Sequence, residues 1–259
     1  MLAVVLIAEL IVASVLVLAP SPQGHGRTVE LVSLGGERTD PVLGRVRSAI
    51  GAAVAAVEQF WGTDWQRRIT VVATDSDAQF AAEAHLDPNR QWTDIAAVAV
   101  ADEVDPARRA ASGQRIVLAP GAAAMSDEAL RIVVTHELFH FAARADTAVD
   151  APRWFTEGVA DFVARRPEPV PAAEAANTAL PGDTDLDNPG ALRSAGYDRA
   201  WWFARFVADE FGVDGLRRLY QQACGPGHGD FPDSVRRAPG IDAGALQMRW
   251  GRWLARATG

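Results

Sequence analysis

The chain has 259 residues and a formal net charge of −8, and 49% of its residues are hydrophobic, enough for the core of one sizeable domain or of two small lobes. All 25 basic residues are arginines, the acidic residues are scattered, and no basic stripe with interleaved aromatic residues occurs, so nucleic acid is excluded as an expected partner. None of these features indicates an oligomeric state.

An apolar run near the N-terminus, residues 2–19, is interrupted only by Glu9 and one serine. Because about 18–20 apolar residues can span a bilayer, we predict that residues 1–19 form a transmembrane anchor or a signal segment, followed by a linker at residues 20–26. We favour an uncleaved anchor, since no basic residue precedes the run and Pro20 disfavours cleavage after it. The rest of the chain would then be extracytoplasmic. A cleaved signal, and hence a secreted protein, and a buried soluble helix are the alternatives.

The part of the chain after the linker is expected to alternate between strands and helices. A long helix is predicted from the Thr39-Asp40-Pro41 start to about Trp61, because proline is favoured in the first helical turn. A short helix is predicted at residues 77–85. β-Branched and apolar residues predict strands at four places, which are residues 28–34, 69–73, 96–101 and 115–119.

A helix predicted to begin after Ser126 contains the run His136-Glu137-Leu138-Phe139-His140. Positions i and i+4 share one face of a helix, so the two imidazoles converge on one point. This is the H-E-x-x-H arrangement of two zinc ligands with a glutamate that can act as general base. A surface helix with two unrelated histidines is the alternative interpretation.

A second segment, Pro152-Arg153-Trp154-Phe155-Thr156-Glu157-Gly158-Val159-Ala160-Asp161, offers a third ligand. Catalytic zinc commonly takes three protein ligands and leaves a position for water, and two histidines with one glutamate are a standard set. Sixteen residues separate His140 from Glu157, which suits two helices that cross after a turn at Pro152. Asp161 lies four residues after Glu157 and therefore on the same helical face.

The two segments together resemble the gluzincin metallopeptidases. The chain is most similar to the small bacterial peptidase MA-like domains, which carry a tryptophan just before an E-G-x-A segment. The resemblance implies an α+β, zincin-like fold in which a small mixed sheet lobe, residues 27–125, is followed by a mainly helical lobe, residues 126–259, with the active site between them.

The resemblance also assigns roles to single residues. It implies one zinc ion per chain, bound by His136, His140 and Glu157, and Asp161 as the acceptor of a hydrogen bond from His136, which would orient that ring. It further implies that the strand at residues 115–119 is the sheet edge beside the metal, where an extended peptide could add through backbone hydrogen bonds.

Six further residues are candidates for a role in the site or in packing. The family often uses a tyrosine or histidine downstream of the third ligand to stabilise the oxyanion, and Tyr197 is our candidate, with a packing aromatic as the alternative. His228, in a glycine-rich loop, is the weaker candidate. Tyr220 is predicted to be core and Cys224 structural. His25 and His85 have no neighbours that suggest ligation and are predicted to be solvated or packing residues.

The C-terminal third is predicted to be mainly helical. Residues 167–190 are rich in proline, alanine, aspartate and glycine and are predicted to form a loop at the rim of a cleft, with one short helix near residues 172–178. Helices are predicted beyond it at residues 197–211, 216–223 and 241–257.

These patterns predict a zinc peptidase in which Glu137 activates a water molecule that attacks a peptide carbonyl. Two alternatives remain at this point. One is a zinc-stabilised, catalytically weak binding or scaffold domain at the cell surface. The other is a hydrolase of a non-peptide amide, which the same residues could perform.

Overall fold

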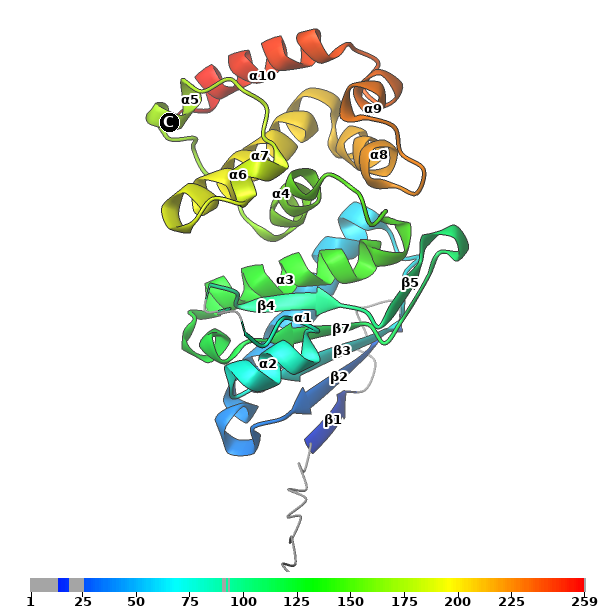
Figure 1. Cartoon of the computed structure of the whole chain (residues 1–259), viewed down its shortest axis with the longest axis vertical. Helices are drawn as coiled ribbons and strands as arrows, with labels where there is room; N and C mark the ends of the chain where they lie inside the picture. Colours follow the sequence, from blue (N-terminus) through cyan, green and yellow to red (C-terminus); the bar gives the residue numbers. More distant parts are fainter. Residues whose placement is uncertain (1–13, 19–25, 90–91, 93, 259) are drawn as a thin grey trace, which may run out of the picture.

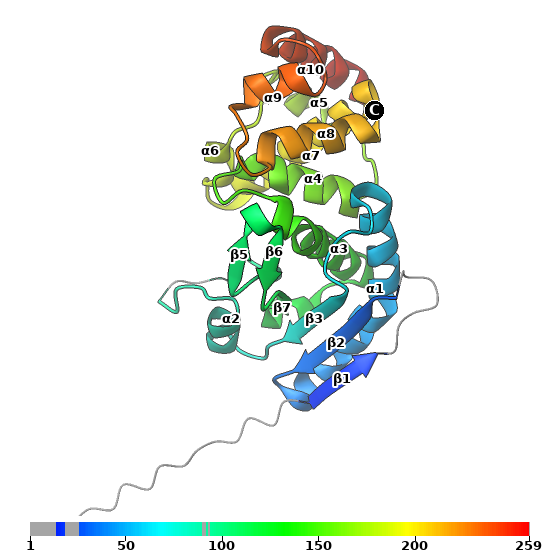
Figure 2. The ribbon, with the colours of Figure 1, turned by 90° about the vertical axis from the view of Figure 1, so that its right-hand side faces the viewer.

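The computed structural model describes residues 14–18, 26–89, 92 and 94–258. Two lobes are stacked along the long axis of the molecule (Figure 1). One lobe holds a β-sheet with helices packed beside it, and the other consists of helices, as Figure 2 shows from the side. The predicted α+β arrangement, with a sheet lobe followed by a mainly helical lobe, is confirmed.

The main sheet contains five strands in the order β1-β2-β3-β7-β4. Its three inner strands run parallel to one another, and the strands at both edges are antiparallel to their neighbours, so the sheet is mixed as predicted. A separate hairpin of β5 and β6 lies between β4 and β7 along the chain. The strands are β1 Ser14–Leu18, β2 Thr28–Ser33, β3 Arg68–Ala73, β4 Ala97–Val100, β5 Glu103–Asp105, β6 Ala110–Ser112 and β7 Arg115–Leu118.

The predicted edge position of the strand at residues 115–119 is wrong. β7 lies between β3 and β4, and β4 forms the edge beside the helix with the two histidines. Ile116, Val117 and Leu118 are all fully buried, as expected of an inner strand that is covered on both faces. The strand that directly precedes the histidine helix in the chain is therefore not the strand at the edge of the sheet.

The predicted membrane segment differs from the structure where the two overlap. Residues Ser14–Leu18 form strand β1, which pairs with β2 so that Val15 lies opposite Val32 and Val17 opposite Glu30. A short apolar run fits a strand as well as a helix, so its periodicity alone cannot distinguish them. Residues 1–13 and 19–25, which include the rest of that segment, lie outside the described residues. Within the described ranges, every helix is too short or too polar to cross a bilayer.

Most helices occur near their predicted positions. α7 begins seven residues before the predicted start at residue 197, and two short helices, α6 and α9, were not predicted. The helices are α1 Asp40–Trp61, α2 Asp77–Glu83, α3 Asp127–Ala143, α4 Arg153–Ala164, α5 Ala172–Ala175, α6 Asp183–Leu186, α7 Gly190–Phe211, α8 Val213–Cys224, α9 Phe231–Arg237 and α10 Ala243–Ala257.

The long helix α1 supports the sheet lobe through one apolar face. Val42, Val46, Ile50 and Val57 recur at helical spacing and are buried in the core that α1 shares with the sheet and with α3. This packing fixes α3 against the sheet, so that the histidine face of α3 is held beside edge strand β4.

α4 carries the E-G-x-A segment and packs closely on α7. Gly158 makes this approach possible, because a Cβ built there would lie 2.3 Å from the carbonyl oxygen of Ala200. The contact is with backbone, which cannot rotate away as a side chain end could. Glycine at this position is therefore explained by helix–helix packing.

Replacing Gly158 by alanine is expected to lower the free energy of unfolding by about 1–3 kcal/mol, because the helices must separate to admit the methyl group. Gly44 is the matched control. It also lies within a helix, but a Cβ there meets nothing within 4 Å, so Gly44→Ala should stabilise the protein by about 0.5–1 kcal/mol. Urea unfolding of both variants tests this. Equal stability of Gly158→Ala and wild type would contradict the close approach.

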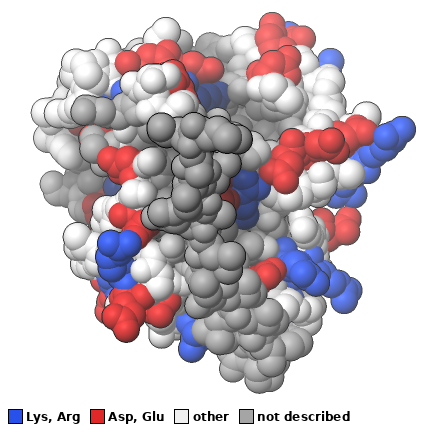
Figure 3. All heavy atoms as spheres, turned by 60° about the horizontal axis from the view of Figure 1, so that its bottom comes forward, with Lys and Arg blue, Asp and Glu red and all other residues white. Residues whose placement is uncertain are grey.

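Charged side chains of both signs are interspersed on the face that Figure 3 shows. Pairs in this lobe include Arg68 with Glu30 at 3.8 Å, where the arginine side chain is largely exposed. Exposed pairs of this kind contribute little to stability.

Candidate active site

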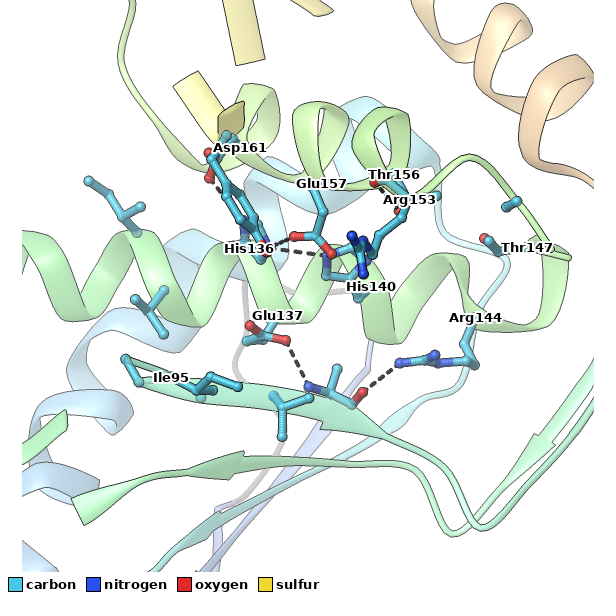
Figure 4. A pocket seen from close by; sticks show the side chains of 18 of the residues that line it. Ile95, His136, Glu137, His140, Arg144, Thr147, Arg153, Thr156, Glu157 and Asp161 are labelled. Carbon is cyan, nitrogen blue, oxygen red and sulfur yellow. Dashed lines mark hydrogen bonds and ion pairs between the residues drawn. The ribbon is translucent and has the colours of Figure 1, made fainter. Parts of the chain in front are cut away.

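The histidines and Glu137 are positioned by α3. The helix begins as predicted, with the Ser126 hydroxyl accepting a hydrogen bond from the backbone N–H of Ala129 at 3.2 Å. One face of α3 then lines a cavity of about 720 Å³ that is bounded by β4 on one side and by α4 on the other. Figure 4 shows His136, His140 and Glu157 turned toward one another across this cavity, with Glu137 directed toward β4.

The three predicted ligand side chains converge. The Nε2 atoms of His136 and His140 are 3.1 Å apart, and the carboxylate of Glu157 lies 3.1 Å from the first and 3.6 Å from the second. One ligand atom from each residue falls within 4.8 Å of the others. The His–His–Glu triad could therefore hold a metal ion.

The donor set fits a metal rather than an isolated hydrogen-bond network. Asp161 contacts Nδ1 of His136 at 2.9 Å, so a proton on Nδ1 leaves the lone pair of Nε2 facing the cavity. Two ring nitrogens 3.1 Å apart can share one hydrogen bond, or both can direct their lone pairs at a single cation. That separation is one that two ligands of a single zinc ion, each about 2.0–2.1 Å from it, can have.

The pKa shifts of the triad residues also fit a bound cation. Burial alone would lower the pKa of His136, but hydrogen bonds and charge from Asp161 and Glu157 outweigh it and hold the pKa well above its ordinary value. For Glu157, burial opposes ionisation, yet the charge of His140 and the hydrogen bonds from both histidines bring its pKa well below the usual range. The cavity thus favours positive charge beside a carboxylate, which is what a bound metal cation provides.

A further network, which the sequence did not indicate, holds Asp161. Arg165, one turn further along the chain, contacts the second oxygen of Asp161 at 3.4 Å and the carboxylate of Asp198 on α7 at 2.7 Å. Its guanidinium also lies 3.6 Å from the ring centroid of Trp201. Arg165 therefore fixes the carboxylate that orients His136, and it connects the site to α7.

α4 is anchored at its start by the residues that precede Glu157. Trp154 packs edge-on against Phe203 of α7, with ring centroids 5.2 Å apart. Its backbone N–H donates to the carboxylate of Asp183 at 2.7 Å, so a residue from the predicted rim loop caps this helix. The tryptophan before the E-G-x-A segment thus positions the third ligand through packing.

Glu137 is held by the sheet edge. Its Oε2 accepts a hydrogen bond of 2.7 Å from the backbone N–H of Ala99 on β4. Burial raises the pKa of Glu137, and the two histidines oppose this only in part. A carboxylate with a raised pKa is a better proton acceptor, as a general base requires.

Arg144 is a site residue that the sequence analysis missed. It follows α3 directly and lies four residues after His140, which brings its side chain to the same cavity. Its Nη2 donates to the carbonyl oxygen of Ala99 at 2.5 Å. The same edge residue therefore contacts Glu137 through its N–H and Arg144 through its C=O (Figure 4). The i, i+4 spacing of His140 and Arg144 was the only signal that could have indicated it.

Both tyrosines line the cavity. Tyr197 is the eighth residue of α7 rather than its first, and burial, followed by the charge of Glu157, raises its pKa to about 12. Its hydroxyl is therefore a neutral donor. Tyr220 is almost fully buried as predicted, and its hydroxyl lies 2.9 Å from that of Thr147.

The structure does not bring His228 to the site. It lies outside the cavity lining, and its Nδ1 is 2.8 Å from the carbonyl oxygen of the next residue. His85 is half-exposed beside Arg115, and Cys224 is buried, as expected of a structural residue. His25 lies outside the described residues.

The fold was compared with solved structures. The chain superposes on aminopeptidase A of Legionella pneumophila, solved in complex with aspartic acid, with a TM-score of 0.51 and 16% sequence identity over 92% of this chain. The chain has the fold of the matching part of that aminopeptidase. This chain spans only 27% of the length of that aminopeptidase.

A two-domain M1 zinc metallopeptidase, as an E323A mutant bound to L-arginine, is also similar, with a TM-score of 0.48 and 12% identity over 95% of this chain and 52% of the other. No family model and no curated protein matches the chain. The predicted resemblance to the gluzincins is thus confirmed at the level of the fold, and the His–His–Glu triad lies between α3 and α4.

Proposed function

We propose that the protein is a zinc-dependent peptidase. The observation that carries the proposal is the convergence of His136, His140 and Glu157 in one cavity, with Glu137 between the histidines in the chain and facing the same space. A purely structural zinc site prefers four protein ligands and needs no base. The similarity of the fold to that of an aminopeptidase also supports a catalytic zinc site.

A zinc ion bound by the triad would polarise a carbonyl group and lower the pKa of a water molecule from 15.7 to about 7. Glu137 would accept the proton of the attacking water and pass it to the leaving amine. The hydrogen bond from Ala99 directs the carboxylate of Glu137 into the cavity, and Asp161 keeps the Nδ1 proton on His136, so that its Nε2 is free to bind.

We propose that the substrate is a peptide or protein segment that lies along edge strand β4. The N–H and C=O of Ala99 point away from β7 toward the cavity, and the same groups of Ala97 share this direction because antiparallel pairing alternates every two residues. Ala97 can therefore pair with an extended chain. The role proposed for residues 115–119 in the sequence analysis thus passes to β4.

Tyr197 is proposed to donate a hydrogen bond to the oxyanion that forms during attack. Replacing Tyr197 by phenylalanine is expected to lower kcat by about 10²–10³-fold with a smaller change in KM, because the bond forms in the transition state. Tyr220→Phe is the control, since its hydroxyl contacts Thr147, and its main cost should be about 1 kcal/mol of stability. A kcat for Tyr197→Phe within a few-fold of wild type would remove Tyr197 from this role.

The proposed activity is tested by incubating the full chain with a peptide library and identifying cleaved bonds by mass spectrometry. Hydrolysis should stop when a chelator removes the metal and return when zinc is added back. A folded protein that holds one zinc ion but cleaves no peptide would contradict the proposal and favour the binding-domain alternative. An extracytoplasmic location of the site remains part of the proposal, while Ser14–Leu18 of the predicted membrane segment belong to strand β1.

A further inference from the structure

The cavity extends to both sides of the metal-ligand triad. Toward the start of β4 it is lined by apolar residues that include Ile95 and Val133. In the opposite direction it continues past Arg144 along the loop between α3 and α4, where Val149 lines it although 94% of this side chain is exposed. Ile95 and Arg144 mark the two directions in Figure 4. A peptide bound at the triad therefore has room to continue in both directions.

Arg144 is a cation with an unused donor at this site. Its Nη2 is bonded to Ala99, but its Nε is buried and has no hydrogen-bond partner among the described residues. No carboxylate of the described chain forms an ion pair with it, whereas the other arginine of the lining, Arg153, is paired with Asp187 at 2.5 Å. Since a buried donor without a partner is costly, a small turn of this side chain toward the cavity that it lines would let the Nε–H bind an oxygen atom of a ligand.

Each acidic side chain that lines the cavity, among the residues that the structure describes, already has a partner or a role. Glu157 belongs to the triad, Asp161 contacts His136, and Glu137 faces Ala99. The fourth, Asp94, precedes Ile95 at the end of the cavity away from Arg144, and it is 78% exposed and 4.0 Å from Arg193. An enzyme that removes single N-terminal residues must bind an ammonium group within about one residue, roughly 3.3–3.6 Å of extended chain, of the attacked carbonyl. The described lining offers no free carboxylate for that purpose.

We propose that Arg144 binds a backbone carbonyl oxygen of the substrate beside Ala99, and that the site therefore acts on internal bonds of peptides whose N-terminus is blocked or distant. This inference rests on the proposed peptidase function. An internal peptide presents a carbonyl at every residue, which the guanidinium group of Arg144 can bind, while a free N-terminal ammonium near Arg144 would be repelled by its charge. The site would thus differ in substrate from the aminopeptidase whose fold it shares.

The first test compares two forms of the same peptides, one with a free N-terminus and one acetylated, using the zinc-loaded full chain. We expect cleavage at internal bonds and a kcat/KM for acetylated peptides at least equal to that for free ones. Release of single N-terminal residues, with acetylated peptides resistant, would overturn the inference and leave the proposed peptidase function standing. If no peptide of either form is cleaved, the peptidase function fails and this inference fails with it.

The second test separates substrate binding from support of the fold. Arg144→Gln should raise KM for the acetylated peptide on the order of tenfold or more, with a smaller change in kcat, since a hydrogen bond from a charged donor is lost. Arg144→Lys keeps the charge without the planar fork and should recover part of the loss. Arg131→Gln is the control, because it removes one charge from α3, the helix that Arg144 follows, at a position outside the cavity lining, and should leave KM unchanged.

A binding measurement gives a readout that does not depend on turnover. In a Glu137→Gln background, which binds but should not cleave, adding Arg144→Gln should weaken the Kd for the acetylated peptide by a similar factor. The melting temperature of each variant shows whether the fold is retained. Unchanged KM and Kd in a folded Arg144→Gln protein would assign Arg144 to holding β4 alone and overturn the inference.

Discussion

Replacing Glu137 by glutamine is expected to lower kcat by about 10²–10⁴-fold, the contribution that a positioned general base usually makes. Glutamine has the same shape, and its amide oxygen can still accept the hydrogen bond from Ala99 that now holds the carboxylate at 2.7 Å. What it lacks is the ability to take a proton from water. The loss should therefore appear in turnover, while the fold and the bound metal are kept.

The measurement is kcat on the best cleaved peptide, with zinc content determined on the same preparation. Glu128→Gln serves as a control, because Glu128 lies in the first turn of the same helix with its side chain 68% exposed. It should cleave peptide at the wild-type rate. If Glu137→Gln also hydrolyses peptide at close to that rate, another group is the base and the proposed mechanism is wrong.

Replacing Glu157 by alanine is expected to remove hydrolysis through loss of the metal itself. The change leaves only the two histidines in the triad and takes away the one ligand that brings negative charge to the cation. Loss of a residue that merely orients a ligand costs about 10–100-fold in metal affinity, so loss of a direct ligand should cost more. Competition with a chelator of known zinc affinity measures this.

The matched control for this variant is Glu128→Ala, which removes the same charge from an exposed position near the start of α3. Its zinc affinity should equal that of wild type. A Glu157→Ala protein that binds zinc as tightly as wild type would show that Glu157 is not a ligand, and the three-residue site would have to be abandoned.

The local parts of the site could be predicted because helical spacing is fixed by the backbone. The i, i+4 relation of His136 and His140 on α3, and of Glu157 and Asp161 on α4, placed each pair on one face before any tertiary contact was known. The crossing of α3 and α4 at Pro152 was also accessible, since proline is compatible with a helix start and the intervening chain is short.

Contacts between segments that are distant in the chain could not be predicted from helical spacing. Asp183 caps α4 from a loop that composition alone described as a rim, and Arg165 reaches Asp198 on α7. Neither pair has a fixed spacing in the chain. The edge position in the sheet was assigned to the wrong strand for the same reason, because strand order depends on packing of the whole lobe rather than on succession along the chain.

The N-terminal apolar run shows a different limit. Its residues suit a membrane helix or a strand, and the described part, Ser14–Leu18, pairs with β2 as a strand.

Arg144 shows a third limit, since an arginine after a helix is usually interpreted as a C-terminal residue that interacts with the helix dipole. The role proposed for Arg144 follows only from the structure, which shows both its hydrogen bond to Ala99 and its Nε–H without a partner.

The central claim is that His136, His140 and Glu157 hold one catalytic zinc ion. The most direct test is the metal content of the purified, folded full chain, determined by elemental analysis after dialysis against zinc at a low, defined concentration. We predict about one zinc ion per chain, lost on chelation together with hydrolysis. A well-folded chain that retains no zinc under these conditions would contradict the claim, and the peptidase function would fall with it.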